Sequence, residues 1–109
     1  MAYDQGLVDR IREVLAAEPG LTERRMFGSY AFLINGHMCG GVKDDRLIIR
    51  TRPENYQATL EKPNVYRFPE EGKVLNNFAT VDDVAFPEDD DLLGWLDEGI
   101  RLARSLPPK

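Results

Sequence analysis

The sequence has a single cysteine, a single histidine and no long apolar segment. One cysteine excludes an internal disulfide framework and any zinc site built from several thiolates. No stretch approaches the roughly 18 apolar residues of a membrane span, and the first residues are too polar for a signal peptide. We therefore expect no membrane association and a cytoplasmic location.

The size and composition are typical of one small globular domain. The chain has 109 residues, of which 42% are hydrophobic and 30% charged. We expect a single domain over residues 1–109, with a modest core that forms without disulfides or metals. The net charge of −5 disfavours general binding to nucleic acid, because non-specific binding depends on cations that neutralise phosphates. A local basic patch remains compatible with this charge.

Three segments carry helix signals. Asp4 can cap a first helix that ends before Pro19, and Pro53 can start a short second helix that ends before Pro63. The segment 88–106 is the clearest helix, since its apolar residues fill about half of the helix circumference. Its acidic residues come first and its arginines near the end, which matches the helix dipole better than it matches a metal site.

Between the helices, the sequence predicts an antiparallel meander. Asn35-Gly36 is a strong hairpin signal between strands 30–34 and 37–42, because both turn residues adopt positive φ. Asp44-Asp45 is a weaker turn signal before a strand at 46–51. Further strand candidates are 22–27, 65–68 and 77–81.

Two-residue turns fix the pairing and therefore the two faces of the sheet. Phe32 then pairs with Cys39, and one face is uniformly apolar, so we expect the helices to pack on it. This predicted helix side consists of Ala31, Leu33, Met38, Gly40, Val42, Leu47 and Ile49. A β-bulge at Gly40-Gly41 would shift the pairing beyond it by one residue.

The second face combines apolar, aromatic and basic residues and is the candidate interaction face. It carries Tyr30, Phe32, Ile34, His37, Cys39, Ile48, Arg50 and Arg52. Three coverings stay open: a second copy in a homodimer, the chain's own residues 63–78, or a ligand. The ligand would be an anion or single-stranded nucleic acid. Its candidate contacts are Lys43, Arg46, Arg50 and Arg52.

His37 and Cys39 are the residues that most suggest chemistry. They supply at most two ligands, whereas zinc takes three or four. Residues two apart on one strand face have Cβ atoms roughly 6–7 Å apart, which is too far for a Cys–His nucleophilic pair. We therefore expect Cys39 to pack as a small apolar residue, and we expect no catalytic residue, metal or cofactor. A small metal- or thiol-dependent enzyme centred on the two residues is the alternative.

Several motifs resemble those of one known family. They are R-M-F-G at 25–28, A-F-L-I-N-G at 31–36, M-C-G-G-V at 38–42, D-R-L at 45–47 and A-R-S-L-P-P-K at 103–109. Over nearly its whole length the chain resembles the N-terminal domain of the TfoX/Sxy family of bacterial competence regulators.

The resemblance implies an α+β fold with about five antiparallel strands and helices on one face, similar to secretion-chaperone-like folds. It also implies a non-enzymatic regulatory or interaction module whose open sheet face pairs two copies. A different protein partner of unknown identity remains open.

Overall fold

The computed structural model describes residues 3–26, 28–68 and 77–109. In chain order the elements are α1 (Gln5–Val14), β1 (Leu21–Met26), β2 (Ser29–Ile34), β3 (His37–Lys43), β4 (Arg46–Arg50), α2 (Pro53–Leu60), β5 (Val65–Arg67), β6 (Phe78–Val81), the 3-10 helix η1 (Asp83–Ala85) and α3 (Asp89–Ser105). Each predicted helix and strand is found within a few residues of its predicted position.

The helix ends are formed by the residues that the sequence indicates. The Asp4 carboxylate accepts hydrogen bonds from the backbone N–H groups of Gly6 and Leu7 at the start of α1. At the start of α3, Asp91 accepts a 3.1 Å bond from the backbone N–H of Glu88. The acidic segment 88–91 therefore caps the N-terminus of α3 and complements the helix dipole, as predicted.

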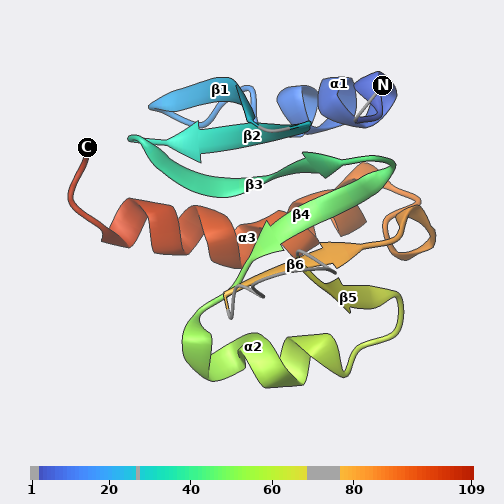
Figure 1. Cartoon of the computed structure of the whole chain (residues 1–109). Helices are drawn as coiled ribbons and strands as arrows, with labels where there is room; N and C mark the ends of the chain where they lie inside the picture. The colour runs from blue at the N-terminus through green and yellow to red at the C-terminus, as the bar shows by residue number, and fades with distance from the viewer. Residues whose placement is uncertain (1–2, 27, 69–76) are drawn as a thin grey trace.

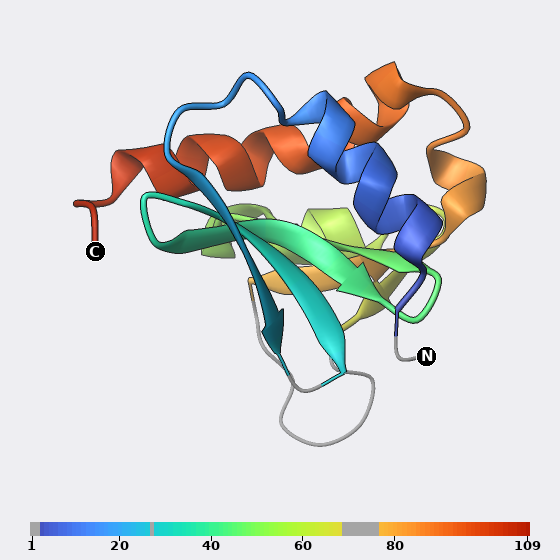
Figure 2. The same ribbon diagram turned by 90° about the horizontal axis from the view of Figure 1, so that it is seen from above.

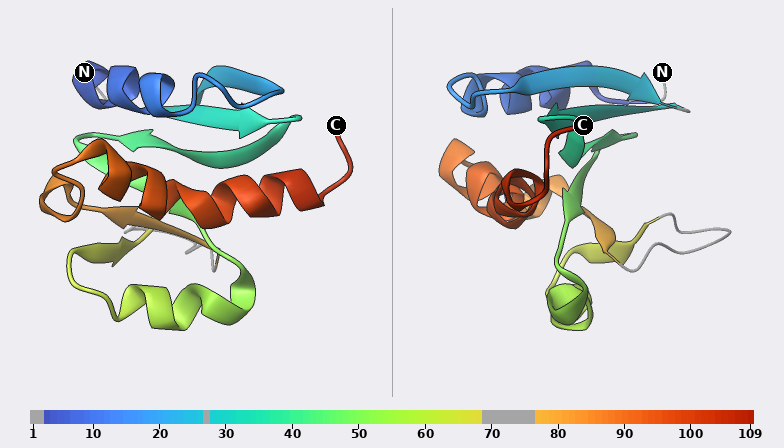
Figure 3. Two further views of the ribbon diagram at one scale, coloured as in Figure 1. Left: turned by 180° about the vertical axis from the view of Figure 1, so that it is seen from behind. Right: turned by 90° about the vertical axis from the view of Figure 1, so that its left-hand side faces the viewer.

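All described strands belong to one antiparallel sheet in the order β1-β2-β3-β4-β6-β5. The first four form a meander, and α2 with β5 is inserted before β6 returns to pair with β4 (Figure 1). Viewed from above and from the side, α1 and α3 lie on one face of the sheet (Figures 2 and 3). The predicted two-layer α+β fold is confirmed, with six strands in the described residues where about five were predicted.

A β-bulge in β3 changes the predicted pairing. The Asn35-Gly36 turn forms as predicted, with φ of 54° and 87°, and Leu33 pairs with Met38. Beyond that pair, Phe32 lies opposite Gly40, so the predicted pairing of Phe32 with Cys39 is wrong. One extra residue in β3 shifts the alternation of side chains on β2 relative to the rest of the sheet.

The bulge reverses the predicted facing of β2 and of Met38 and Cys39 on β3. Tyr30, Phe32, Ile34 and Cys39 pack with the core under the helices, whereas Ala31, Leu33 and Met38 take the other face. On β4, Leu47 and Ile49 face the helices as predicted. Among the described residues, the buried side chains form one core cluster between the sheet and the helices. It consists of Leu7, Val8, Ile11, Leu15, Phe32, Ile34, Cys39, Val42, Leu47, Ile49, Val65, Ala79, Val81, Phe86, Leu92, Leu96, Ile100 and Ala103.

Helix α3 lies very close to the sheet at Gly99. A Cβ atom on Gly99 would overlap with the carbonyl oxygen of Cys39, the extra residue of the bulge. Gly94, one and a half turns earlier on the same helix, has no atom within 4 Å of an added Cβ. The two glycines therefore differ in role, since only Gly99 is required by packing.

No helix among the described residues is long and apolar enough to cross a membrane.

We predict opposite effects of alanine at the two glycines of α3. Gly99→Ala should lower the free energy of unfolding by about 2 kcal/mol, because the added methyl group pushes α3 away from β3. Gly94→Ala should raise it by about 0.5–1 kcal/mol, because alanine favours the helix and meets no neighbour. Urea unfolding followed by circular dichroism measures both, and equal stabilities of the two variants would contradict this packing.

Candidate functional site

One face of the sheet carries no helix among the described residues, and we call it the helix-free sheet face (Figure 3). Side chains on it alternate with those of the core. Its apolar members are Ala31, Leu33, Met38, Ile48 and Phe78, and its basic members are Arg24, Lys43 and Arg46. Ala31 and Ile48 are fully buried, whereas Phe78 is half-buried.

Arg46 is held by two neighbours on this face. Its Nε donates a 3.1 Å bond to Asp82 Oδ1, and its guanidinium lies 4.0 Å from the centre of the Tyr66 ring. The Tyr66 hydroxyl donates a 3.0 Å bond to the other oxygen of Asp82. Arg46 therefore has an established structural role at one end of the face.

Arg50 lies on the same strand, four residues further on. Its Nη1 donates a 2.9 Å bond to the Met38 carbonyl, and its guanidinium lies 5.5 Å from the centre of the Phe78 ring. Burial lowers the pKa of Arg50 from its ordinary value. Its Nε and the Thr80 hydroxyl are buried atoms without a hydrogen-bond partner in the described part of the chain.

The predicted interaction face does not form one surface. Ile48 lies on the helix-free sheet face, whereas the side chain of Arg50, at the end of β4, starts close to Gly99 of α3. The bulge and the reversed β2 place four others in or against the core. These four are Tyr30, Phe32, Ile34 and Cys39. Tyr30 donates a 2.6 Å bond to Glu23 on β1, and Arg12 of α1 binds the same carboxylate at 2.7 Å. Tyr30 therefore anchors α1 to the sheet.

His37 is held at the other end of the sheet by the C-terminal segment. Its Nε2 lies 2.7 Å from the Pro107 carbonyl oxygen, so this nitrogen donates the hydrogen bond. The backbone N–H of Lys109 donates a 2.9 Å bond to the Asn35 carbonyl. The segment after α3 thus closes over the β2–β3 turn, and His37 has a structural partner.

The four predicted anion contacts are spread over the molecule. Lys43 and Arg46 are cross-strand neighbours, and Arg50 is four residues along β4. Arg52 has left the sheet at the start of α2, where its backbone N–H donates a 2.6 Å bond to Glu98 Oε2. Lys43 and Arg46 are therefore adjacent, whereas Arg52 lies apart from them.

The predicted self-cover by residues 63–78 is only partly described. Its residues 65–67 and 78 belong to β5 and β6, so they extend the sheet and do not lie over it. Residues 69–76 of that segment lie outside the described residues.

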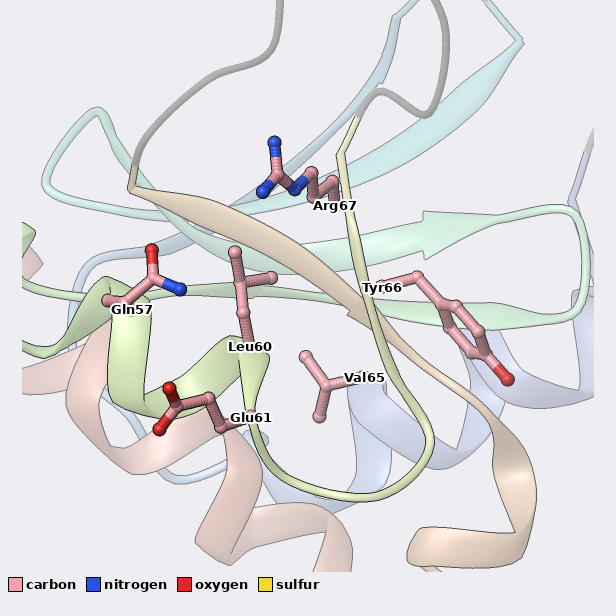
Figure 4. Close-up of a pocket in the computed structure, with 6 residues that line it drawn as sticks. All are labelled: Gln57, Leu60, Glu61, Val65, Tyr66 and Arg67. Carbon is pink, nitrogen blue, oxygen red and sulfur yellow. The ribbon is translucent and has the colours of Figure 1, made fainter.

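A shallow groove of about 460 Å³ lies between α2 and the edge strand β5 (Figure 4). We call it the α2–β5 groove, and it is lined by Gln57, Leu60, Glu61, Val65, Tyr66 and Arg67. The sequence contained no signal for this groove, because a helix and a three-residue strand become its walls only when both are placed in three dimensions.

Comparison with protein-family models identifies a domain family. The model of the TfoX N-terminal domain matches residues 13–103, which is most of the chain. The chain belongs to the TfoX N-terminal domain family. No curated protein and no solved structure matches it. Membership in the TfoX N-terminal domain family supports a regulatory or interaction module, and this family is not known to be enzymatic.

In this TfoX N-terminal domain, Cys39 lies in the core, where burial raises the pKa of its thiol to about 12. A buried, protonated thiol is a poor nucleophile. Among the described residues, no group of three or more His, Cys, Asp and Glu side chains could hold a metal ion. Cys39 therefore acts as a packing residue of the bulge.

The raised pKa of Cys39 predicts a loss of stability at alkaline pH. Above the ordinary thiol pKa of 9.0, the unfolded chain releases a proton that the folded domain retains until about pH 12. The free energy of unfolding should then fall by up to about 1.4 kcal/mol per pH unit. The control is Cys39→Ala, which lacks this proton but keeps Tyr30, whose pKa is also raised, chiefly by its hydrogen bond to Glu23.

Urea unfolding at pH 8, 9 and 10 measures the effect. The stability advantage of the wild type over Cys39→Ala should shrink as the pH rises, and a constant difference would contradict a buried thiol.

Proposed function

We propose that the protein is a non-enzymatic regulatory or interaction module that forms a homodimer through its helix-free sheet face. One observation carries this proposal. The described helices α1 and α3 cover one face of the six-stranded sheet, and the other face is also rich in apolar side chains. Of these side chains, Met38 and Phe78 are half-buried in the single chain, and a second layer would cover them.

The apolar character of this face fits a second copy better than a ligand, because polar contacts are few on it. A second copy also provides an identical apolar face, as an isologous dimer requires.

The positions of His37 and Cys39 support a non-enzymatic role. Cys39 is fully buried with a raised pKa, and the His37 ring is bound to the Pro107 carbonyl. A buried, protonated Cys39 is a poor nucleophile, and His37 Nε2 serves a structural hydrogen bond. The unpaired thiol is typical of a protein of the reducing cytoplasm, which we include in the proposal.

The dimer proposal predicts a selective effect of charge on the helix-free sheet face. Phe78→Glu should raise the dimer dissociation constant at least tenfold, which is about 1.4 kcal/mol, because two like charges would then be buried across the interface. The domain should stay folded, since Phe78 is half-buried and the new carboxylate lies beside Arg50. Sedimentation equilibrium measures the dissociation constant.

The matched control is Leu93→Glu, the same kind of change at an exposed apolar residue on α3 in the other layer. It should leave the dissociation constant unchanged. A wild-type protein that sediments as a monomer at 100 µM, or an equal effect of both variants, would refute the sheet-face dimer.

A further inference from the structure

We propose that the α2–β5 groove binds an extended peptide, which adds to the sheet as an antiparallel strand beside β5. This surface is separate from the helix-free sheet face, since it lies at the edge of the sheet and not over it (Figures 1 and 4). It would give the interaction module a second partner, of a different kind from its own copy.

The backbone of β5 presents unpaired groups at this edge. Asp82 donates a 3.0 Å backbone bond to the Asn64 carbonyl, so residues 64 and 82 form a hydrogen-bonded pair of the β5–β6 ladder. Because bonded pairs alternate in an antiparallel ladder, Tyr66 bonds toward β6, and the polar groups of Val65 and Arg67 point outward. These outward groups have no partner in the described residues, as a strand-adding peptide requires.

Helix α2 turns this edge into a groove. Leu60 packs against the buried Val65, and the two give the groove an apolar floor. Gln57 and Glu61 project from α2 on one side, and the strand forms the other (Figure 4). Main-chain bonds to β5 would provide affinity, and the floor would receive one aliphatic side chain of the peptide.

The charges of the groove select the sequence and direction of the peptide. Arg67 lies at one end of the groove, and Glu61 lies near the α2–β5 connection at the other end (Figure 4). Both side chains are exposed, and neither forms an ion pair with another described residue. An antiparallel peptide begins at the Arg67 end, so it fits best with an acidic residue first and a basic residue last.

A second copy is a poorer occupant of this edge. Its own β5 is flanked by its own α2, so two such edges cannot approach closely enough to pair without a collision of the helices. A short extended segment has no such obstacle.

The test uses two acetylated and amidated peptides of identical composition, Glu-Thr-Val-Thr-Lys and Lys-Thr-Val-Thr-Glu. Alternate side chains of a strand share one side, so the first, third and fifth residues face Arg67, the apolar floor and Glu61. Titration of the ¹⁵N-labelled full chain should shift the amide signals of Val65 and Arg67. The peptide that begins with Glu should bind at least threefold more tightly than its reversed control.

Two variants with the same charge change complete the experiment. Arg67→Glu should abolish the preference between the peptides, whereas Arg24→Glu, at the opposite edge on β1, should retain it. Both residues are exposed, and a retained amide spectrum confirms folding.

Three results would overturn the proposal: no shifts at β5, equal affinity for both peptides, or a preference that survives in Arg67→Glu. Shifts of the β5 signals with protein concentration alone would also overturn it, since a second copy would then occupy the edge. Sedimentation of the same samples reports the sheet-face dimer independently, so failure of one proposal is distinguishable from failure of the other.

Discussion

The β-bulge at Cys39 and the contact of Gly99 with it hold the two layers of this domain together. The bulge places Cys39 and Gly40 against α3, where only a glycine at position 99 allows the helix to approach the carbonyl oxygen of Cys39. The same extra residue decides that Phe32 and Ile34 face the helices. The composition of the core and of the opposite face both depend on this local irregularity.

Around this contact, polar links fasten the helices to the sheet at separate points. Arg12, Glu23 and Tyr30 join α1 to β1 and β2, with Glu23 shared by the other two. The hydrogen bond from Arg12 lowers the pKa of Glu23, so this link stabilises the fold above the ordinary carboxyl pKa of 4.5 and is lost as the pH falls below it. Glu98 of α3 binds the start of α2 in a similar way. These links tie α1 to the β1–β2 pair and α3 to the start of α2.

The residues with reactive potential are used for structure: Cys39 packs in the core, and His37 holds the C-terminal segment. The accessible features are a sheet face without a described helix and a strand edge beside α2. Both are surfaces on which a protein chain can add a layer or a strand, in agreement with membership in the TfoX N-terminal domain family.

The sequence by itself determined the positions of the helices and strands, the Asn35-Gly36 turn and the pairing of β3 with β4. It also determined the two-layer fold class. These features depend on helix and strand propensity, capping and hydrophobic alternation, which are local properties of the chain. The motifs also identified the family. The tertiary structure alone decided the facing of β2, because a bulge depends on the fit of Cys39 and Gly40 beneath α3. It also decided the α2–β5 groove, whose walls are brought together by the return of β6 to β4 and not by any local pattern.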